Sequence, residues 1–312
     1  MKEFQNLNQL SPLLTRGSVV TLGNFDGIHL GHQKLIELVL EKSNILNLPS
    51  ILITYFPNPS LVLGKANNFK SIYSEKKKKE IVSKFGIDYL LIIEFTNELS
   101  QMSATEFLES ILINKLKVKH IVIGHNHCFG KAREGDFDFL LKHSNDYGYT
   151  VEKIDQVFLG DKKISSSSIR TLISEGKVSD ANLILGRNFS YSGKVIEGEK
   201  KGRAIGFPTA NIELNSELLL PKNGVYACYI YYEEKKYPAM INIGNKPTAG
   251  NFSLGLEANI LDFDKDIYGT ELEVFFVDRI RDERKFSSFD ELVLELKKNR
   301  NDTIEILQKK SK

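Results

Sequence analysis

Two histidines near the start of the chain stand where phosphate chemistry is expected. Residues 23–32 read GNFDGIHLGH and join an apolar run to a long amphipathic pattern, which predicts a turn between a strand and a helix. The first turn of a helix presents unpaired N–H groups and the positive end of the helix dipole, so anions bind there. His29 and His32 are three residues apart and would point the same way from that turn. Gly27 and Gly31 would let phosphate oxygens approach the backbone.

The histidine pair could act without a covalent intermediate, because two imidazole donors can stabilise the charge that develops on a phosphorus under attack. Two other interpretations stay open: the pair could only cap the helix, or it could be half of a zinc site. Zinc has little support, since no Glu separates the two histidines as in a zinc protease, although His125 and His127 prevent its exclusion. The pattern favours phosphate chemistry.

Three later segments could extend this site. Residues 164–170, ISSSSIR, would offer hydroxyls, N–H groups and a guanidinium to a phosphate chain at another helix start, with a plain serine cap as the alternative. Residues 124–130, GHNHCFG, follow the fourth predicted strand, where a ligand-contacting loop belongs. The lysine run at 76–79 could clamp phosphate, but glutamates flank it and a solvated helix face is favoured.

A second candidate site lies in residues 202–211, GRAIGFPTAN, although a simple turn with a rigid proline remains the alternative. Its glycines permit close approach to phosphate, and Thr209 and Asn211 supply neutral oxygens of the kind that Mg²⁺ accepts beside phosphate oxygens. No Walker lysine is present. Glu257 lies in a predicted strand and faces away from its two neighbours, so it could act as a general base or simply sit on an exposed sheet face.

The first half alternates short apolar runs with helix-length amphipathic segments. Helices are predicted over residues 30–46, from Ser103, whose Glu106 completes a capping box, and after Gly135. This alternation implies a parallel sheet covered on both faces, with ligands beyond the carboxyl ends of the strands. The predicted strands are residues 19–23, 51–55, 89–95, 120–124 and 149–157.

The pattern changes near Gly186, which is placed like the C-terminal stop of a helix over residues 179–185. We therefore predict two domains, residues 1–186 and residues 187–312. The second is β-rich with turn signals, which indicates a small antiparallel barrel or sandwich, closed by a helix from about Ser288 with Glu291 in a second capping box. The predicted strands are residues 191–197, 225–232, 237–243, 254–263 and 271–280, with a hairpin loop at 233–236.

Composition narrows the class of protein. A chain of 312 residues exceeds what one core usually supports, and a net charge of +2 does not suggest a nucleic-acid partner held by bulk charge. Cys128 and Cys228 are too few for a disulfide framework. No apolar run approaches the ~18 residues that a membrane span requires. We expect a cytoplasmic protein without a membrane or nucleic-acid partner, and small anionic ligands remain open.

The segment at residues 23–32 resembles the nucleotidyltransferase signature of bacterial bifunctional riboflavin kinase/FAD synthetases. Residues 56–59, FPNP, the loop around Asn126 and residues 164–170 stand where that family has matching motifs. The resemblance implies a Rossmann-like N-terminal domain that transfers AMP from ATP to FMN, with His29 and His32 as catalytic residues. It implies nucleotide contacts from Gly23, Phe25, Asp26, Gly27, Asn126, Ser165, Ser166 and Arg170.

The second half resembles the flavokinase domain of the same enzymes. GFPTAN and three later segments, at residues 221–226, 243–248 and 256–263, match in order. The resemblance implies a six-stranded barrel in which Thr209 and Asn211 hold magnesium against ATP and Glu257 takes the proton from the ribityl hydroxyl of riboflavin. It implies nucleotide contacts from Gly202, Gly206, Pro208, Thr209 and Asn211.

Two departures from the family pattern concern the first site. Ser166, Ser167 and Ser168 form a run where the family has a threonine and one more arginine, and His127 and Cys128 replace an aromatic and a basic residue. They put the strength and selectivity of adenylylation in doubt. The leading hypothesis is two-step chemistry with riboflavin, FMN, FAD and ATP as ligands. The alternatives are a nucleotidyltransferase with another phosphorylated acceptor, fused to an unrelated barrel, and a flavin-binding regulator without turnover.

Overall fold

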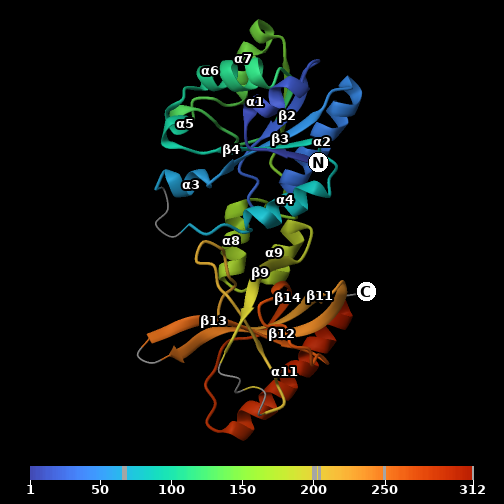
Figure 1. Cartoon of the computed structure of the whole chain (residues 1–312), viewed down its shortest axis with the longest axis vertical. Coiled ribbons are helices and arrows are strands. Elements are labelled where there is room, and N and C mark those ends of the chain that lie inside the picture. Colours follow the sequence, from blue (N-terminus) through green and yellow to red (C-terminus); the bar gives the residue numbers. More distant parts are fainter. Residues whose placement is uncertain (65–68, 199–201, 203–204, 249–250, 311–312) are drawn as a thin grey trace. The chain divides into compact units, whose positions relative to one another are not determined.

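The computed structural model describes residues 1–64, 69–198, 202, 205–248 and 251–310. Their contacts divide the chain into two compact units, Met1–Ser166 and Ser167–Lys312 (Figure 1). Each unit is described by itself below. None of the helices in these ranges is both long and apolar enough to cross a membrane.

The first unit contains a six-stranded sheet in the order β1-β4-β3-β2-β5-β6, with every pair parallel. The five strands predicted from sequence are confirmed, with β6 three residues shorter at its end. The edge strand β1 was missed, since three residues are too few to show an alternating pattern. The strands are β1 (Lys2–Phe4), β2 (Ser18–Leu22), β3 (Ser50–Phe56), β4 (Tyr89–Glu94), β5 (Val118–Gly124) and β6 (Thr150–Ile154).

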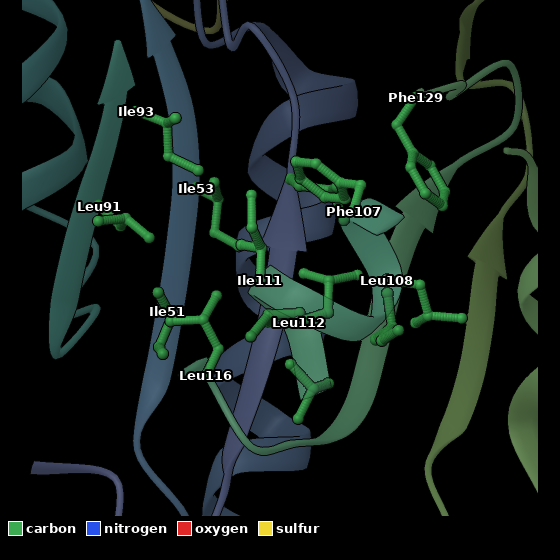
Figure 2. Close-up of a cluster of buried hydrophobic side chains, with 14 of the residues drawn as sticks. Ile51, Ile53, Leu91, Ile93, Phe107, Leu108, Ile111, Leu112, Leu116 and Phe129 are labelled. Atoms are coloured by element: carbon green, nitrogen blue, oxygen red, sulfur yellow. The ribbon is translucent and has the colours of Figure 1, made fainter. Parts of the chain in front are cut away.

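Helices pack on both faces of this sheet. The predicted helix over residues 30–46 is confirmed as α2 (Leu30–Leu46), and the capping box of Ser103 and Glu106 opens α6 (Ala104–Phe107). A π-helical segment (Leu108–Lys115) continues α6, and Figure 2 shows its apolar side chains facing β3, with α2 behind the strands. The remaining helices of eight or more residues are α4 (Glu75–Ser83) and α7 (Phe137–Tyr147), and the shorter ones are α1 (Leu7–Leu10), α3 (Pro59–Val62) and α5 (Asn97–Gln101).

The order of the strands marks one place in this sheet for a ligand. After β2 the chain adds β3 and β4 on one side, and then crosses over to add β5 and β6 on the other. Strands β2 and β5 are therefore neighbours at the point where the winding reverses, and in open α/β sheets ligands bind beyond the carboxyl ends of such a pair. The segments that follow these two ends are residues 23–29 and 125–130.

The second unit is built on a closed barrel in the order β10-β13-β12-β11-β14-β9, with every described pair antiparallel. The barrel prediction is confirmed, and closure leaves no free sheet edge. The terminal helix α11 (Phe289–Lys310) packs on β11, β12 and β14. The strands are β9 (Phe189–Ile196), β10 (Ala210–Ile212), β11 (Gly224–Tyr232), β12 (Lys235–Thr248), β13 (Asn251–Ile260) and β14 (Glu271–Arg281).

Several predicted details of the second half differ in the structure. Strand β10 was not foreseen, because it lies inside the GFPTAN motif and has only three residues. Helix α8 (Ser166–Ser174) begins within the serine run rather than after it. Helix α9 (Val178–Leu185) does end at a left-handed Gly186. At α11 the Glu291 N–H donates to Ser288, but its carboxylate accepts from Ser287, so the predicted reciprocal box is offset by one residue.

Candidate active sites

Residues 23–29, here called the histidine turn, connect β2 to α2 in a strained conformation. Phe25 and Ile28 both have positive φ, at 47° and 41°, although neither is glycine. Both side chains are fully buried, and so is the carboxylate of Asp26, whose Oδ1 accepts from the Ile72 N–H at 3.0 Å. Left-handed residues with side chains of this size persist only where surrounding contacts hold the backbone in place, and they are frequent at functional sites.

The histidine pair itself forms the start of α2. His29 is the N-cap, and its Nδ1 accepts the His32 N–H at 3.2 Å, so the capping interpretation describes a real contact. Accepting at Nδ1 places the proton of the neutral ring on Nε2, which leaves Nε2 as a donor. The two rings stack at 3.7 Å between centroids. Gly31 permits this, since a Cβ there would come within 3.2 Å of the His29 ring. Capping and donating are therefore compatible roles.

The loop after β5 brings Asn126 beside the sheet position predicted for a ligand, with His125 and Asn126 exposed. His127 turns inward and stacks on Phe129, and burial, with a smaller effect of Arg133, lowers the pKa of His127 to about 4. A neutral imidazole there replaces the aromatic residue of the family pattern. Within residues 1–64, 69–198, 202, 205–248 and 251–310, no group of three His, Cys, Asp or Glu side chains could hold a metal ion. The zinc alternative gains no support from this geometry.

Ser166 of the serine run contacts the histidine turn. The Ser166 hydroxyl donates to the Asp26 carbonyl at 2.7 Å, which links the start of α8 to the turn. Ser165 lies directly before the helix. Arg170 follows Ser166 by four residues and so shares its face of α8, but it falls in the second unit.

In the barrel, the predicted glycine-flanked motif is a turn that leads into β10. The N–H groups of Ile205 and Phe207 donate to the Gly202 carbonyl at 3.2 and 2.9 Å, and residues 203 and 204 lie outside the described residues. Gly206 is left-handed with φ 79°, and Pro208 follows Phe207 and accepts a hydrogen bond from Asn259 at 2.7 Å. This fixes the approach of the chain to Thr209 and Asn211.

The strand register places Glu257 between two amides. Asn211 of β10 and Asn242 of β12 are its direct cross-strand partners on either side. All three line a cavity of about 420 Å³ together with Thr209, and this space is here called the barrel cavity. Glu257 thus lines a cavity on the face of the strands that α11 covers, rather than an exposed sheet face. Apolar side chains complete the cavity: Ile205, Phe207, Val225, Met240, Leu292 and Leu296.

The sequence analysis missed Asn242 and Arg281, two polar residues that line the barrel cavity, and Gly198, which lies against Asn211. Asn242 interrupts an apolar strand, which was a usable signal. Gly198 permits Asn211 to sit where it does, because a Cβ there would lie 1.9 Å from the Asn211 amide nitrogen. Arg281 lines the cavity, with its Nε 2.9 Å from Glu295 and 3.1 Å from Asn299 of α11. The last two depend on pairings between distant segments, which no local pattern shows. Thr209 also lines a second cavity of about 450 Å³, beside Pro208 and Tyr268.

Both halves match known families. Residues 12–168 match the family described as FAD synthetase, and residues 185–307 match the one described as riboflavin kinase. Curated relatives named bifunctional riboflavin kinase/FMN adenylyltransferase include one from Buchnera aphidicola subsp. Acyrthosiphon pisum, 40% identical and covering 94% of each chain. The Escherichia coli K12 protein of that name is 33% identical, over 94% of this chain and 93% of its own. The chain belongs to the bifunctional riboflavin kinase/FMN adenylyltransferase family.

A solved structure shares the fold over nearly the whole chain. A solved Streptococcus pneumoniae structure, titled a macrolide-efflux protein, superposes with a TM-score of 0.87 at 32% identity, covering 97% of this chain and 98% of that one. A bifunctional riboflavin kinase/FMN adenylyltransferase carries both activities in the domain order seen here. The alternative of an unrelated barrel behind a nucleotidyltransferase is wrong, because residues 185–307 match the riboflavin kinase family.

Proposed function

We propose that the chain makes FAD in two steps at two separate sites. In the barrel cavity, riboflavin and ATP give FMN and ADP. At the histidine turn, FMN and a second ATP give FAD and pyrophosphate. The observation that carries the proposal is the register that sets Glu257 between Asn211 and Asn242 in a cavity shared with Thr209, because it brings a base and neutral oxygen ligands together.

In the kinase step the ribityl hydroxyl attacks the γ-phosphorus of ATP, and ADP leaves. Glu257 accepts the hydroxyl proton, since its carboxylate is the base that lines the cavity between two amides. The apolar wall from Phe207, Val225 and Met240 suits a flat aromatic ring system. The cavity therefore orients the flavin while Glu257 directs the reacting hydroxyl.

Thr209 and Asn211 fit a magnesium ion. They are two residues apart at the start of β10 and so share one face, and both line the barrel cavity. A hydroxyl and an amide supply hard, neutral oxygens, which suits an ion that keeps several waters and binds phosphate oxygens. When bound, the ion would neutralise phosphate charge during transfer.

In the adenylyl step an FMN phosphate oxygen attacks the α-phosphorus of ATP, and pyrophosphate leaves. His29 and His32 donate to the phosphate oxygens as charge develops, and no covalent enzyme intermediate is formed. The N–H groups at the start of α2 add to the same field. Backbone contacts with the nucleotide are assigned to Gly23, Phe25, Asp26 and Gly27. Polar contacts are assigned to Asn126, Ser165, Ser166 and Arg170.

Flavin chromatography tests the function. The full chain is incubated with riboflavin, ATP and Mg²⁺, and riboflavin, FMN and FAD are then separated. Appearance of both FMN and FAD is the expected result. Absence of both would favour a flavin-binding regulator without turnover, and FMN alone would remove the adenylyl step from the proposal.

We further propose that the functional boundary lies near Gly186. The riboflavin kinase match begins at residue 185, which supports this boundary. Asn182 of α9 accepts from the Phe189 N–H at 2.7 Å and donates to the Phe276 carbonyl at 2.8 Å, so α9 stabilises strands β9 and β14 from outside this boundary. Fragments 187–312 and 167–312 are both expected to phosphorylate riboflavin, with the longer one unfolding at higher urea. If only the longer fragment folds, the boundary moves to Ser167.

A cytoplasmic location is also proposed. Cys128 and Cys228 are both free thiols, and the chain offers no other cysteine to pair with them. Small secreted proteins rely on disulfides, whereas thiols of this kind persist in a reducing compartment. Fractionation of cells with an antibody to the chain tests this location.

A further inference from the structure

One lysine of the run at residues 76–79 contacts the histidine turn. Lys77 pairs with Glu80, and Lys79 pairs with Glu3 and Glu75, so these two lysines have carboxylate partners. Lys78 instead reaches the histidine turn, where its Nζ donates to the Asn24 carbonyl at 3.0 Å. The interpretation of the whole run as a solvated face is therefore wrong at Lys78.

A third group closes a small network around that carbonyl. Thr54 of β3 is buried, and its hydroxyl donates to the Asn24 carbonyl at 3.2 Å while accepting from Lys78 Nζ at 3.4 Å. The Asn24 carbonyl thus receives a charged donor and a neutral donor from two different elements. Hydrogen bonds with a charged donor are roughly twice as strong as neutral ones.

We propose that Lys78 is a positioning residue of the adenylyl-transfer site, which holds the histidine turn in its strained shape by fixing the Asn24 carbonyl. The inference rests on the proposed assignment of adenylyl transfer to His29 and His32. Lys78 acts through the backbone, and the reacting groups are others.

The strain of the turn explains why such a brace is needed. Asn24 directly precedes Phe25, the first of the two left-handed residues, and Ile28 directly precedes His29. Relaxation of either residue would rotate the chain that carries the histidine and the N–H groups of α2. Ile72 and Ser166 hold Asp26 from two further segments, and Lys78 and Thr54 hold Asn24 from the side.

The surroundings of the Lys78 ammonium fit a structural role close to an anion-binding site. Burial lowers the pKa of Lys78 from its ordinary value, and the charges of Asp26 and Glu75 offset part of this effect. A partly desolvated cation binds a carbonyl oxygen more strongly than one in water, because the local dielectric is lower. The same charge adds to the positive potential at the start of α2.

Four variants of the full chain test the inference: Lys78→Met, Lys78→Arg, Lys79→Met and Thr54→Val. For each, FMN adenylylation, riboflavin phosphorylation and thermal unfolding are measured on one preparation. Lys79→Met is the matched control, since it removes a neighbouring charge whose partners lie away from the turn. Riboflavin phosphorylation is an internal control for the barrel and for the amount of protein, and thermal unfolding reports whether the first unit is folded.

Lys78→Met is expected to lower kcat for adenylylation about 10- to 100-fold, which is the usual effect of losing a hydrogen bond from a charged donor. The KM for ATP should change much less, because the lysine does not contact the nucleotide. Riboflavin phosphorylation should stay at the wild-type rate. Lys78→Arg should recover most of the loss, Thr54→Val should show a smaller selective loss, and Lys79→Met should behave as wild type.

The inference is overturned if Lys78→Met adenylylates FMN at the wild-type rate, or if both activities fall together. Equal losses in Lys78→Met and Lys79→Met would also overturn it, because general surface charge would then be the cause. If Lys78→Met fails to fold, Thr54→Val is the test. An unchanged adenylylation rate in Thr54→Val would then contradict the proposal. Wild-type FAD formation, measured first, tests the assigned function separately from the role of Lys78.

Discussion

The histidine turn keeps its shape through strained backbone, whereas the barrel cavity keeps its shape through strand register. In the turn, two non-glycine residues with left-handed backbone lie within four positions, and contacts from β3, α4 and α8 hold this segment. In the cavity, Glu257 lies in regular β-structure, and its neighbours are set by pairing with β10 and β12. A local motif braced from outside therefore supports one reaction, and a closed ring of strands supports the other.

This difference predicts how each site fails. A change at the turn should act locally and leave the barrel untouched, because the two sets of residues belong to different compact units, with only Arg170 of the adenylyl set across the division. The effect of a change in the barrel cavity should depend on how far that change disturbs the strand register. The predictions below are ordered by the size of the expected effect.

The largest effect is expected from removing both histidines. His29→Ala with His32→Ala should abolish FAD formation, since each such donor typically contributes about 10²- to 10³-fold. FMN formation should stay near wild type. Flavin chromatography from riboflavin measures both steps at once. Equal loss of both products would mean that the pair supports the fold or a shared site.

The corresponding variant for the kinase site is Glu257→Gln, which preserves the shape of the side chain but removes its ability to accept a proton. Riboflavin phosphorylation should fall by roughly 10²- to 10⁴-fold, the usual contribution of a positioned general base. FMN supplied directly should still become FAD at the wild-type rate. A near wild-type kinase rate would show that Glu257 is only a wall residue.

A smaller loss is expected when the register is kept but one amide is displaced. Gly198→Ala puts a Cβ 1.9 Å from the Asn211 amide nitrogen, so the Asn211 side chain must leave its position. Riboflavin phosphorylation should drop about tenfold or more, since small displacements of positioning groups cost that much. Steady-state kinetics against wild type checks this, and adenylylation serves as the internal control. An unchanged rate would remove Asn211 from the site.

The smallest effect concerns pH and the loop beside the histidine turn. The folded pKa of His127 is about 4, against 6.5 ordinarily, so the unfolded chain gains a proton first as pH falls. The free energy of unfolding of the first unit should therefore decrease from pH 6.5 towards 4. His127→Phe should reduce this decrease by roughly 1 kcal/mol at pH 5. Urea unfolding at pH 7 and pH 5 measures the free energy of unfolding of wild type and variant. An equal decrease in both proteins would contradict the prediction.

The sequence predicted the turn better than the cavity, for a physical reason. Gly23, His29 and His32 lie within one short segment of the sequence, so the strand end, the turn and the helix start could be recognised together. The cavity wall was foreseen only at Gly202, Thr209, Asn211 and Glu257. Lys78 was misjudged because a charge run resembles a solvated face whenever its distant partner, here the Asn24 carbonyl, is unknown.

The central claim is that the two sites act independently, and a mixing experiment tests it most directly. The Glu257→Gln chain and the chain with both His29→Ala and His32→Ala are given riboflavin, ATP and Mg²⁺, first separately and then together. Neither alone should make FAD. The mixture should make it, because FMN released by the second chain is adenylylated by the first. FAD made by either chain alone, or a mixture that accumulates FMN without FAD, would contradict the account.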